Sequence, residues 1–251
     1  MYKKHKILAL IPARGGSKRL KNKNILPLAG KPLIAHTIDF ALASKYIDRV
    51  IVSTDSLSIA RVAKRYKAEV PFLRPAKIAE DRTSDYPVVA HAIRWLKENE
   101  DYSVDIVVFL RPTVPLRAKG LAERCIERLV NNAADSVRTV RSVGRYHPYW
   151  MLTVDKNGKA HPFIKGKSVD RYYQKQLLPA LYEHDGYCDA ILSKNIDINC
   201  SPDAGLTGFY GQRMSIVMND SPEPLVNIDT YEDFILAEYL MKRGLCHNTR
   251  K

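Results

Sequence analysis

Short apolar runs alternate with amphipathic segments along most of this chain. The runs have the length and the nearly continuous apolar character of buried strands, and they occupy Ile7–Ile11, Arg49–Ser53, Asp105–Leu110, Ser136–Val140 and Met214–Met218. Apolar residues spaced three and four apart predict helices over 32–45, 57–66, 87–98, 121–131 and 231–243. This order predicts an α/β fold, a three-layer Rossmann-like sandwich around a mainly parallel sheet.

The alternation stops between residues 143 and 185. Prolines and aromatic residues interrupt the pattern there, and Asp155-Lys156-Asn157-Gly158 has the composition of a hairpin turn. We therefore expect a single domain over residues 1–251 that carries a small excursion over 143–185.

The net charge of +13 over 251 residues favours an anionic partner. The cations are spread along the chain without an arginine-rich arm or a zinc-finger spacing, so we expect a small ligand and no nucleic acid. The scattered cysteines indicate reduced thiols and no metal cluster; they are Cys125, Cys188, Cys200 and Cys246. No run of about 18 apolar residues occurs and Pro12 interrupts the N-terminal run, so we expect a cytoplasmic protein without a membrane span.

The loop after the first strand carries the strongest chemical signal. Gly15 and Gly16 stand there among the cations Arg14, Lys18, Arg19, Lys21 and Lys23. Glycine lets a backbone approach a ligand closely, and exposed amides with cationic side chains form an anion-binding concavity. Neither the Walker A spacing nor G-x-G-x-x-G occurs. A solvated basic turn is the alternative, but the position directly after a strand favours a polyphosphate ligand.

Residues 11–18 read Ile-Pro-Ala-Arg-Gly-Gly-Ser-Lys, and Lys23-Asn24 follows. This stretch resembles the signature of the acylneuraminate cytidylyltransferases, and the resemblance extends over residues 7–240, most weakly between 141 and 215. It implies the fold of the nucleotide-diphospho-sugar transferases and a CTP-dependent reaction. The implied acceptor is a 2-keto-3-deoxy sugar acid, a nonulosonate like sialic acid, and pyrophosphate is released. The resemblance also implies a homodimer formed through the 143–185 excursion.

The resemblance places the nucleotide on this loop and on a later segment. The loop residues that match are Arg14, Gly15, Gly16, Ser17, Lys18, Lys23 and Asn24. Leu73-Arg74-Pro75-Ala76, with Asp81, Thr83 and Ser84 downstream, resembles the segment that recognises cytosine, so we expect Arg74 and Ser84 to bind the nucleotide. Ser53-Thr54-Asp55 also matches, although the end of a strand and a helix cap explain these residues equally.

The sugar site is expected on two segments that depart from the family pattern. Arg111-Pro112-Thr113 has an arginine where the family has glutamine, and an arginine could clamp a carboxylate with two prongs. Pairing of Arg111 with an internal acid is the alternative. Lys175 and Gln176 match a segment in which an arginine binds the sugar carboxylate, and lysine keeps that charge but loses the planar fork.

The metal site is expected in Val226-Asn227-Ile228-Asp229-Thr230. Strand alternation places Asn227 and Asp229 on one face, and Asp229 meets the preference of Mg²⁺ for a carboxylate beside substrate phosphates. The family has aspartate at both positions, so the resemblance makes Asn227 a weaker ligand. The alternative is that Asp229 caps the last helix, at whose start Thr230 and Asp233 resemble a capping box. We expect Arg14, Lys18 and Asp229 to carry the catalysis.

Three alternatives remain open on the sequence. A nucleotidyltransferase for another acceptor, an octulosonate or a phosphonate, would keep the loop and change the region of Arg111 and Lys175. A glycosyltransferase with a similar sheet would carry a mid-chain Asp-x-Asp, which this chain lacks. A non-catalytic CTP sensor is suggested by Asn227.

Overall fold

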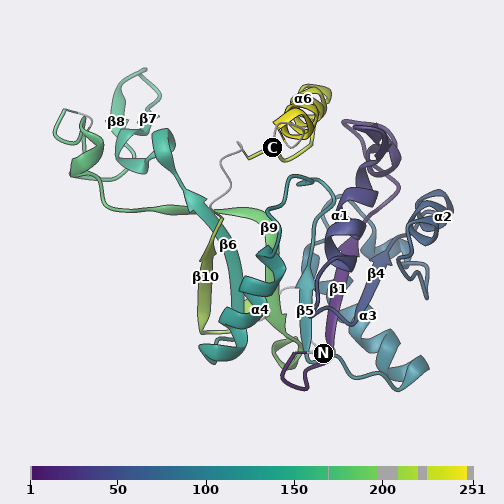
Figure 1. The fold of residues 1–251 in the computed structure, drawn as a ribbon. Coiled ribbons are helices and arrows are strands. Elements are labelled where there is room, and N and C mark those ends of the chain that lie inside the picture. Colours follow the sequence, from purple (N-terminus) through teal and green to yellow (C-terminus); the bar gives the residue numbers. More distant parts are fainter. Residues whose placement is uncertain (1, 169, 197–208, 220–224, 248–251) are drawn as a thin grey trace. The chain divides into compact units, whose positions relative to one another are not determined.

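The computed structural model describes residues 2–168, 170–196, 209–219 and 225–247 (Figure 1). In this part of the chain a sheet of six strands has the order β10-β6-β9-β5-β1-β4. Its strands are β1 (Ile7–Pro12), β4 (Arg49–Ser53), β5 (Ile106–Phe109), β6 (Ser136–Ser142), β9 (Tyr182–Leu192) and β10 (Met214–Met218). β1 lies parallel to both β4 and β5, with Leu10 opposite Ile51 and Phe109.

Helices cover both faces of this sheet. They are α1 (Leu33–Leu42), α2 (Leu57–Arg65), α3 (Asp85–Glu100), α4 (Leu121–Asn131) and α6 (Tyr231–His247). An apolar core lies on each face of the sheet, and β1 contributes to both because side chains alternate along a strand. Ile7 and Ile11 pack with residues of α1, α2 and α4, whereas Leu8 and Leu10 pack with residues of α3. The three-layer α/β fold that the sequence predicts is confirmed.

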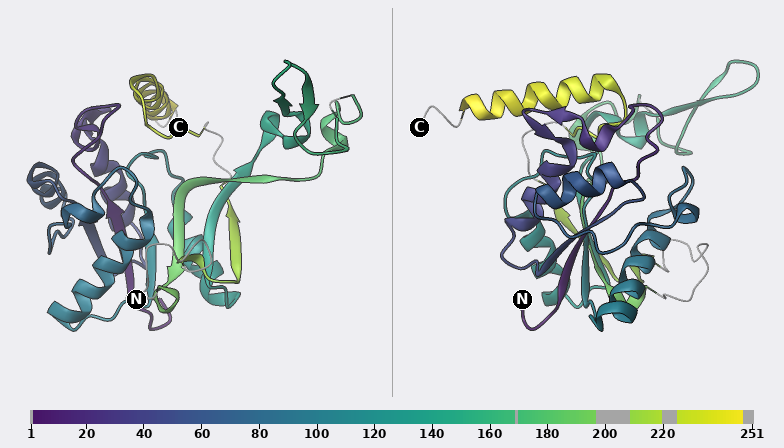
Figure 2. Two further views of the ribbon diagram at one scale, coloured as in Figure 1. Left: turned by 180° about the vertical axis from the view of Figure 1, so that it is seen from behind. Right: turned by 90° about the vertical axis from the view of Figure 1, so that its right-hand side faces the viewer.

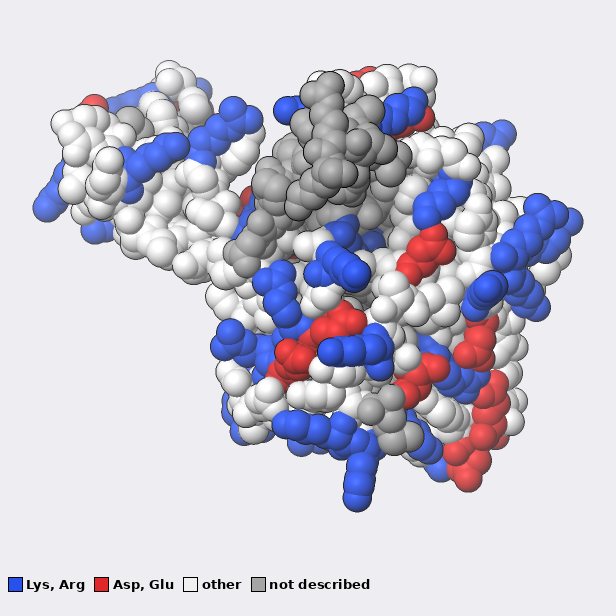
Figure 3. Space-filling model, in the orientation of Figure 1, with Lys and Arg blue, Asp and Glu red and all other residues white. Residues whose placement is uncertain are grey.

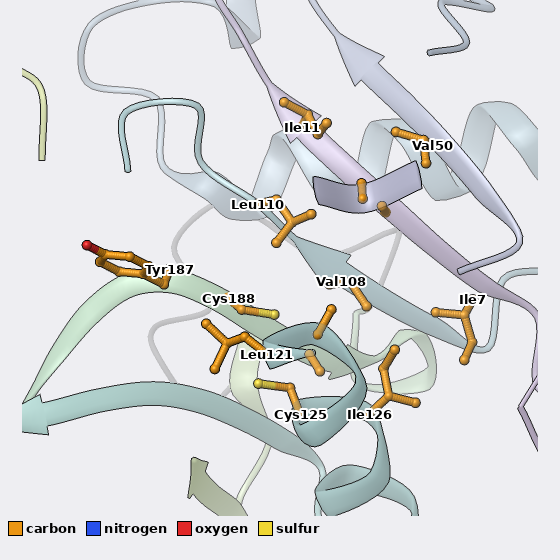
Figure 4. Close-up of a cluster of buried hydrophobic side chains, with 14 of the residues drawn as sticks. Ile7, Ile11, Val50, Val108, Leu110, Leu121, Cys125, Ile126, Tyr187 and Cys188 are labelled. Carbon is orange, nitrogen blue, oxygen red and sulfur yellow. The ribbon is translucent and has the colours of Figure 1, made fainter. Parts of the chain in front are cut away.

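The core beside α4 contains the two buried cysteines of the described chain. Cys125 of α4 and Cys188 of β9 are free thiols that lie with Leu121, Val108 and other apolar side chains (Figure 4). The neighbouring Cys125 thiol, and then burial, raise the pKa of Cys188 well above its ordinary value. Cys188 therefore remains protonated, and both cysteines serve as packing residues, as expected. Cys200 and the side chain of Cys246 lie outside what the structure describes.

β9 is a strand that the apolar pattern does not predict. It lies antiparallel to β5, with Phe109 opposite Asp189. Its sequence, Tyr-Glu-His-Asp-Gly-Tyr-Cys-Asp-Ala-Ile-Leu, places aspartates where a buried strand would have apolar residues. Asp189 is completely buried, and it is tolerated there because Arg111 and Arg138 neutralise it.

The chain divides into two compact units, one made of residues 1–139 and 186–251 and the other of Val140–Asp185. The second unit contains a hairpin of β7 (Leu152–Val154) and β8 (Ala160–Pro162), which confirms the predicted turn. Gly158 has a φ of 79°, and the Asp155 carboxylate accepts the amides of Asn157 and Lys159. Short 3₁₀ helices complete this unit at Gly144–Tyr146, Pro148–Trp150 and Lys175–Leu177.

α6 closes the first unit beyond the carboxyl ends of β1 and β4 (Figure 2). It packs on the small hairpin of β2 (Pro27–Leu28) and β3 (Lys31–Pro32), where Phe234 and Leu240 join an apolar cluster with Leu28 and Leu33. No helix in the described ranges is long and apolar enough to cross a membrane.

Candidate active site

A pocket of about 490 Å³ opens at the carboxyl end of β1. It brings together nine of the residues expected to form the site: Arg14, Ser17, Lys18, Lys23, Asn24, Arg74, Arg111, Thr113 and Asp229. Loops that follow parallel strands meet at one edge of a sheet, which is why positions far apart in the sequence converge here. Gly15, Gly16 and Ser84 are sequence neighbours of lining residues, and Asn227 stands two residues before Asp229; none of the four lines the pocket.

Cations are dispersed along the sequence and do not gather in one segment. On the face drawn in Figure 3, lysine and arginine side chains are interleaved with acidic ones and do not form one continuous patch. The pocket also mixes the two signs, because its cations share the walls with Glu80, Asp81, Asp85 and Asp229. The arrangement of these acids decides which cations are available to a ligand.

Asp81 pairs with two of the cations expected on a triphosphate. Its carboxylate contacts the guanidinium of Arg14 and the ammonium of Lys18. Lys18 and then Arg14 hold the pKa of Asp81 below its ordinary value. The Lys18 side chain is 78% exposed, so it is free to turn toward an incoming anion.

Lys23 is held more firmly than Lys18. Its side chain is only 12% exposed, and its ammonium donates to the Ile228 carbonyl at 2.6 Å and to Asp229 Oδ1 at 2.9 Å. Asn24 is buried, and its amide donates to the Arg14 carbonyl at 3.1 Å. Asn24 therefore shapes the loop.

The glycine loop presents fewer amides than the sequence suggests. The Gly15 amide donates to Asp55 Oδ1 at 2.8 Å, and the Ser17 amide donates to the Gly15 carbonyl at 3.0 Å. A side chain at Gly15 would lie 3.0 Å from Ser56 Cβ, so the close approach to that residue favours glycine. Asp55 thus anchors the loop, and Ser56 forms the N-cap of α2 by accepting the Ile59 amide.

Arg74 is a buried cation without an ion-pair partner among the described residues. Its Nε donates to Ser53 Oγ at 3.0 Å, and Nη2 donates to the Ser53 carbonyl. Burial lowers the pKa of Arg74 to about 10, although Asp55 and Asp85 oppose that shift. A guanidinium that lines the pocket and contacts only neutral oxygens is well placed to donate to a ligand.

Arg111 is paired with the buried Asp189 and with Asp85 on the pocket wall, and pairing with an acid of the protein was the alternative to a carboxylate clamp. Nη1 lies 3.0 Å from Asp189, and Nη2 lies 2.5 Å from Asp85. Because both terminal nitrogens are engaged, a two-pronged grip on a substrate carboxylate would require these ion pairs to break. Arg117 in the same segment braces the backbone, since its guanidinium donates to the Tyr187 and Arg111 carbonyls.

Asp229 is not the cap of the last helix. Asp233 accepts the amides of Asp229 and Thr230 at 3.0 and 2.8 Å, and Thr230 Oγ1 accepts the Asp233 amide at 3.3 Å. The predicted capping box is confirmed, and it leaves the Asp229 carboxylate for the pocket. Asn227 Nδ2 lies 3.4 Å from Asp229 Oδ2.

Two expected residues lie in the other unit, and the acid Asp85 of the pocket wall was not expected. Lys175 and Gln176 are exposed on the 3₁₀ helix of the Val140–Asp185 unit. Asp85 was not expected at the site, because an acid in the first turn of a helix is explained by the helix dipole. Asp189 was missed for a different reason, since it lies in the unpredicted strand β9.

Comparison with known proteins identifies a family model and several relatives of this chain. The sequence model described as cytidylyltransferase matches residues 8–242. A CMP-N,N'-diacetyllegionaminic acid synthase of Legionella pneumophila is 35% identical, over 94% of this chain and 97% of its own. A post-translational flagellin modification protein B of Campylobacter coli is 30% identical, over 94% and 95%. A pseudaminic acid cytidylyltransferase of Campylobacter jejuni is 41% identical, over 51% and 54%.

Solved structures of similar fold include a CMP:2-keto-3-deoxy-manno-octonic acid synthetase complexed with CTP. It has a TM-score of 0.67 at 19% identity and covers 95% of this chain and 99% of its own. A 4-diphosphocytidyl-2C-methyl-D-erythritol synthase of Anaerococcus prevotii has a TM-score of 0.64 at 17% identity, over 95% and 97%. These likenesses establish the fold alone. From the extent of the family match and the full-length similarity to the Legionella protein, the chain belongs to the cytidylyltransferase family.

Proposed function

We propose that this chain transfers the cytidylyl group of CTP to the anomeric hydroxyl of a nonulosonate, a 2-keto-3-deoxy sugar acid like sialic acid, with release of pyrophosphate. The observation that carries the proposal is the convergence of Arg14, Lys18 and Lys23 with Asp229 in one pocket of a cytidylyltransferase. The names of the full-length Legionella relative and of the Campylobacter pseudaminic acid enzyme support this class of acceptor.

The residues present suit the chemistry of this transfer. The anomeric oxygen bonds to the α-phosphorus while the bond from that phosphorus to the bridging oxygen of the β-phosphate breaks. Pyrophosphate leaves with the electron pair, and the hydroxyl proton is lost. Arg14, Lys18 and Lys23 would stabilise the charge that grows on the leaving group, since fixed cations act most strongly where charge develops. No covalent enzyme intermediate is needed, so the pocket requires no nucleophile.

Asp229 and Asn227 fit a magnesium ion. Mg²⁺ takes one or two carboxylates together with phosphate oxygens and water, and the Asp229 carboxylate lies on the pocket wall with its side chain 46% exposed. We propose that Asp229 holds the ion and that Asn227 supports it from the neighbouring position. Bound there, the ion would neutralise part of the triphosphate charge.

We also propose a homodimer formed through the Val140–Asp185 unit. That unit exposes large apolar side chains, among them Leu152, Val154, Phe163 and Tyr173, which are 55% to 68% exposed. Exposed apolar side chains in such number mark an interaction surface. The free thiols of Cys125 and Cys188 support a cytoplasmic setting.

Pyrophosphate release tests the proposed function. The protein would be incubated with each of the four ribonucleoside triphosphates, magnesium and a panel of nonulosonates, octulosonates and phosphonates. Release with CTP and a nonulosonate is the expected result. Release only with an octulosonate or a phosphonate would contradict the proposed acceptor class. CTP binding without pyrophosphate release for any acceptor would contradict the enzymatic activity and favour a CTP sensor.

A further inference from the structure

A fixed donor and a fixed acceptor lie together in the pocket. Arg74, which is 6% exposed, offers a guanidinium bonded only to oxygens of Ser53. Asp85 begins α3 and lines the same pocket. Its Oδ2 accepts from Arg111, whereas Oδ1 has no hydrogen-bond partner among the described residues. Both side chains line the same pocket, and the charge of Asp85 opposes the lowering of the Arg74 pKa by burial.

The position of Asp85 is set from inside the protein. Arg111 joins Asp85 to Asp189, and Asp189 is completely buried between Arg111 and Arg138, with distances of 3.0 and 3.3 Å. The guanidinium of Arg111 also lies 4.9 Å from the centre of the Phe109 ring, in the middle of the core. This chain of ion pairs runs from the core to the pocket and holds one carboxylate oxygen of Asp85 toward Arg111.

The pair of Arg74 and Asp85 matches cytosine better than uracil. Cytosine carries an amino donor at N4 beside acceptors at N3 and O2, and a carboxylate is a natural acceptor for that amino group. Uracil carries a carbonyl oxygen in place of the amino group, so it would set an acceptor against the carboxylate. Both bases offer O2 to a donor such as Arg74, so a contact at O2 does not distinguish them, whereas a carboxylate that faces position 4 does.

We infer that Asp85 is the residue that selects cytosine over uracil, and that Arg111 is the positioning residue that holds it. The inference rests on the proposed function, because it assigns the base of the nucleotide to the same pocket. It also gives a physical reason for an arginine at position 111 that does not involve the sugar carboxylate.

Asp85→Asn provides the sharpest test. Arg111 can only donate, so the amide oxygen of the new side chain would face Arg111 and its NH₂ group would face the ligand. The acceptor becomes a donor, which suits O4 of uracil. Calorimetric binding of CTP and of UTP to the full chain should show CTP weakened about tenfold or more, UTP tightened, and the ratio of the two constants reduced about 100-fold.

Two further variants guard the interpretation. Asp101→Asn removes the same charge at the other end of α3, from an exposed residue that does not line the pocket, and its ratio of CTP to UTP affinity should match that of the parent chain. Arg111→Lys keeps the charge but loses the fork, and it should reduce the ratio while the thermal transition remains cooperative.

The outcomes separate the inference from the function on which it rests. A parent chain that binds UTP as well as CTP would overturn the proposed function. A parent chain that prefers CTP, together with an Asp85→Asn variant of unchanged ratio, would overturn the inference alone. A variant whose ratio is unchanged but whose acceptor KM rises would assign Asp85 to the sugar and would also overturn it.

Discussion

Lys18 and Lys23 carry the same charge in different surroundings. Lys18 is exposed and paired only with the half-exposed Asp81, whereas Lys23 is enclosed and donates to Asp229 and to a backbone carbonyl. A flexible exposed lysine contributes a movable charge, while an enclosed lysine contributes a fixed one. We expect the two residues to serve the triphosphate differently, Lys18 by closing on it and Lys23 by holding the site in shape.

Lys18→Ala should weaken CTP binding about 10- to 100-fold and abolish turnover, since a hydrogen bond from a charged group contributes about 1.5 to 3 kcal/mol. Fluorescence or calorimetric titration with CTP measures the first effect, and pyrophosphate release measures the second. Lys21→Ala removes the same charge from an exposed residue of the loop that does not line the pocket. Equal losses in both variants, or none in Lys18→Ala, would contradict the role of Lys18.

Asn227→Asp should lower the magnesium concentration needed for CTP binding several-fold. A second carboxylate beside Asp229 adds an anionic ligand of the kind that magnesium prefers, and the cation relieves the repulsion between the two acids. Titration of magnesium at fixed CTP measures this effect. Asn132→Asp, on the exposed end of α4, adds the same charge far from the pocket. An unchanged magnesium requirement in Asn227→Asp would show that residue 227 is remote from the ion.

Sequence reasoning found the pocket residues that stand in contiguous motifs and missed those set by tertiary contacts. Arg14, Lys18 and Lys23 belong to one loop, so their convergence is local. Asp85 gains its place from Arg111, which lies 26 residues away, and no local pattern records such a pair. The same contact decides between the two interpretations of Arg111, which the sequence alone left open.

Among the structural elements, the segment before α3 and the glycine loop are joined through Asp81. The 3₁₀ helix Ala76–Ile78 leads into this segment, and Asp81 reaches from it to Arg14 and Lys18. The carboxylate therefore lies on cations that the triphosphate would use. Binding of the nucleotide should part the two segments at this contact.

Asp81→Asn should tighten CTP binding about two- to tenfold at low salt, because CTP no longer has to break the two ion pairs of Asp81. The gain is small because each partly exposed ion pair contributes little. Asp101→Asn is a matched control, since it removes an exposed acid paired with Lys97 on α3. Weaker CTP binding in Asp81→Asn would mean that Asp81 instead arranges Arg14 and Lys18 for the phosphates.

The pH dependence of this contact has a defined sign. Lys18 and Arg14 depress the pKa of Asp81, so the contact is complete above the ordinary aspartate pKa and is lost as the pH falls through the lowered value. The difference in CTP affinity between the parent chain and Asp81→Asn should therefore be constant over the neutral range, roughly pH 6 to pH 8, because this range lies above the ordinary aspartate pKa. A difference that disappears within that range would contradict the ion pairs.

Elements with strong periodicity were predicted closely, and those stabilised by polar contacts were not. The observed bounds of α4 and β10 match the predicted ones, because their apolar positions alone distinguish core from surface. α3 begins at Asp85 and not at Pro87, since the acid and the preceding Ser84 belong to the helix start. β9 was missed because its buried aspartate is neutralised by arginines from other segments, which no local pattern reveals.

At the scale of the whole molecule, the two units differ in how far they bury their apolar side chains. The larger unit buries them on both faces of its sheet, whereas β7 and β8 of the Val140–Asp185 unit are exposed along their whole length. A unit of this size cannot bury enough apolar surface by itself. A second copy of the chain would supply the missing cover.

Phe163→Glu should convert the dimer to a monomer. Phe163 is 55% exposed and its amide donates to the Met151 carbonyl, so the substitution leaves that backbone bond intact and should change the free energy of unfolding by less than about 0.5 kcal/mol. Sedimentation equilibrium measures the mass. Lys156→Ala at the hairpin turn changes the net charge by the same amount and should remain dimeric. A monomeric parent chain, or a dimeric Phe163→Glu variant, would contradict the proposed interface.

The central claim, that this pocket transfers a cytidylyl group, is tested most directly by following the phosphorus. CTP labelled at the α-phosphate in one sample and at the γ-phosphate in another would be incubated with magnesium and a nonulosonate. We predict that the α label appears in a sugar nucleotide and the γ label in pyrophosphate, in equal amounts. Release of the γ label as inorganic phosphate, or an α label that remains in CTP while the nucleotide is bound, would contradict the account.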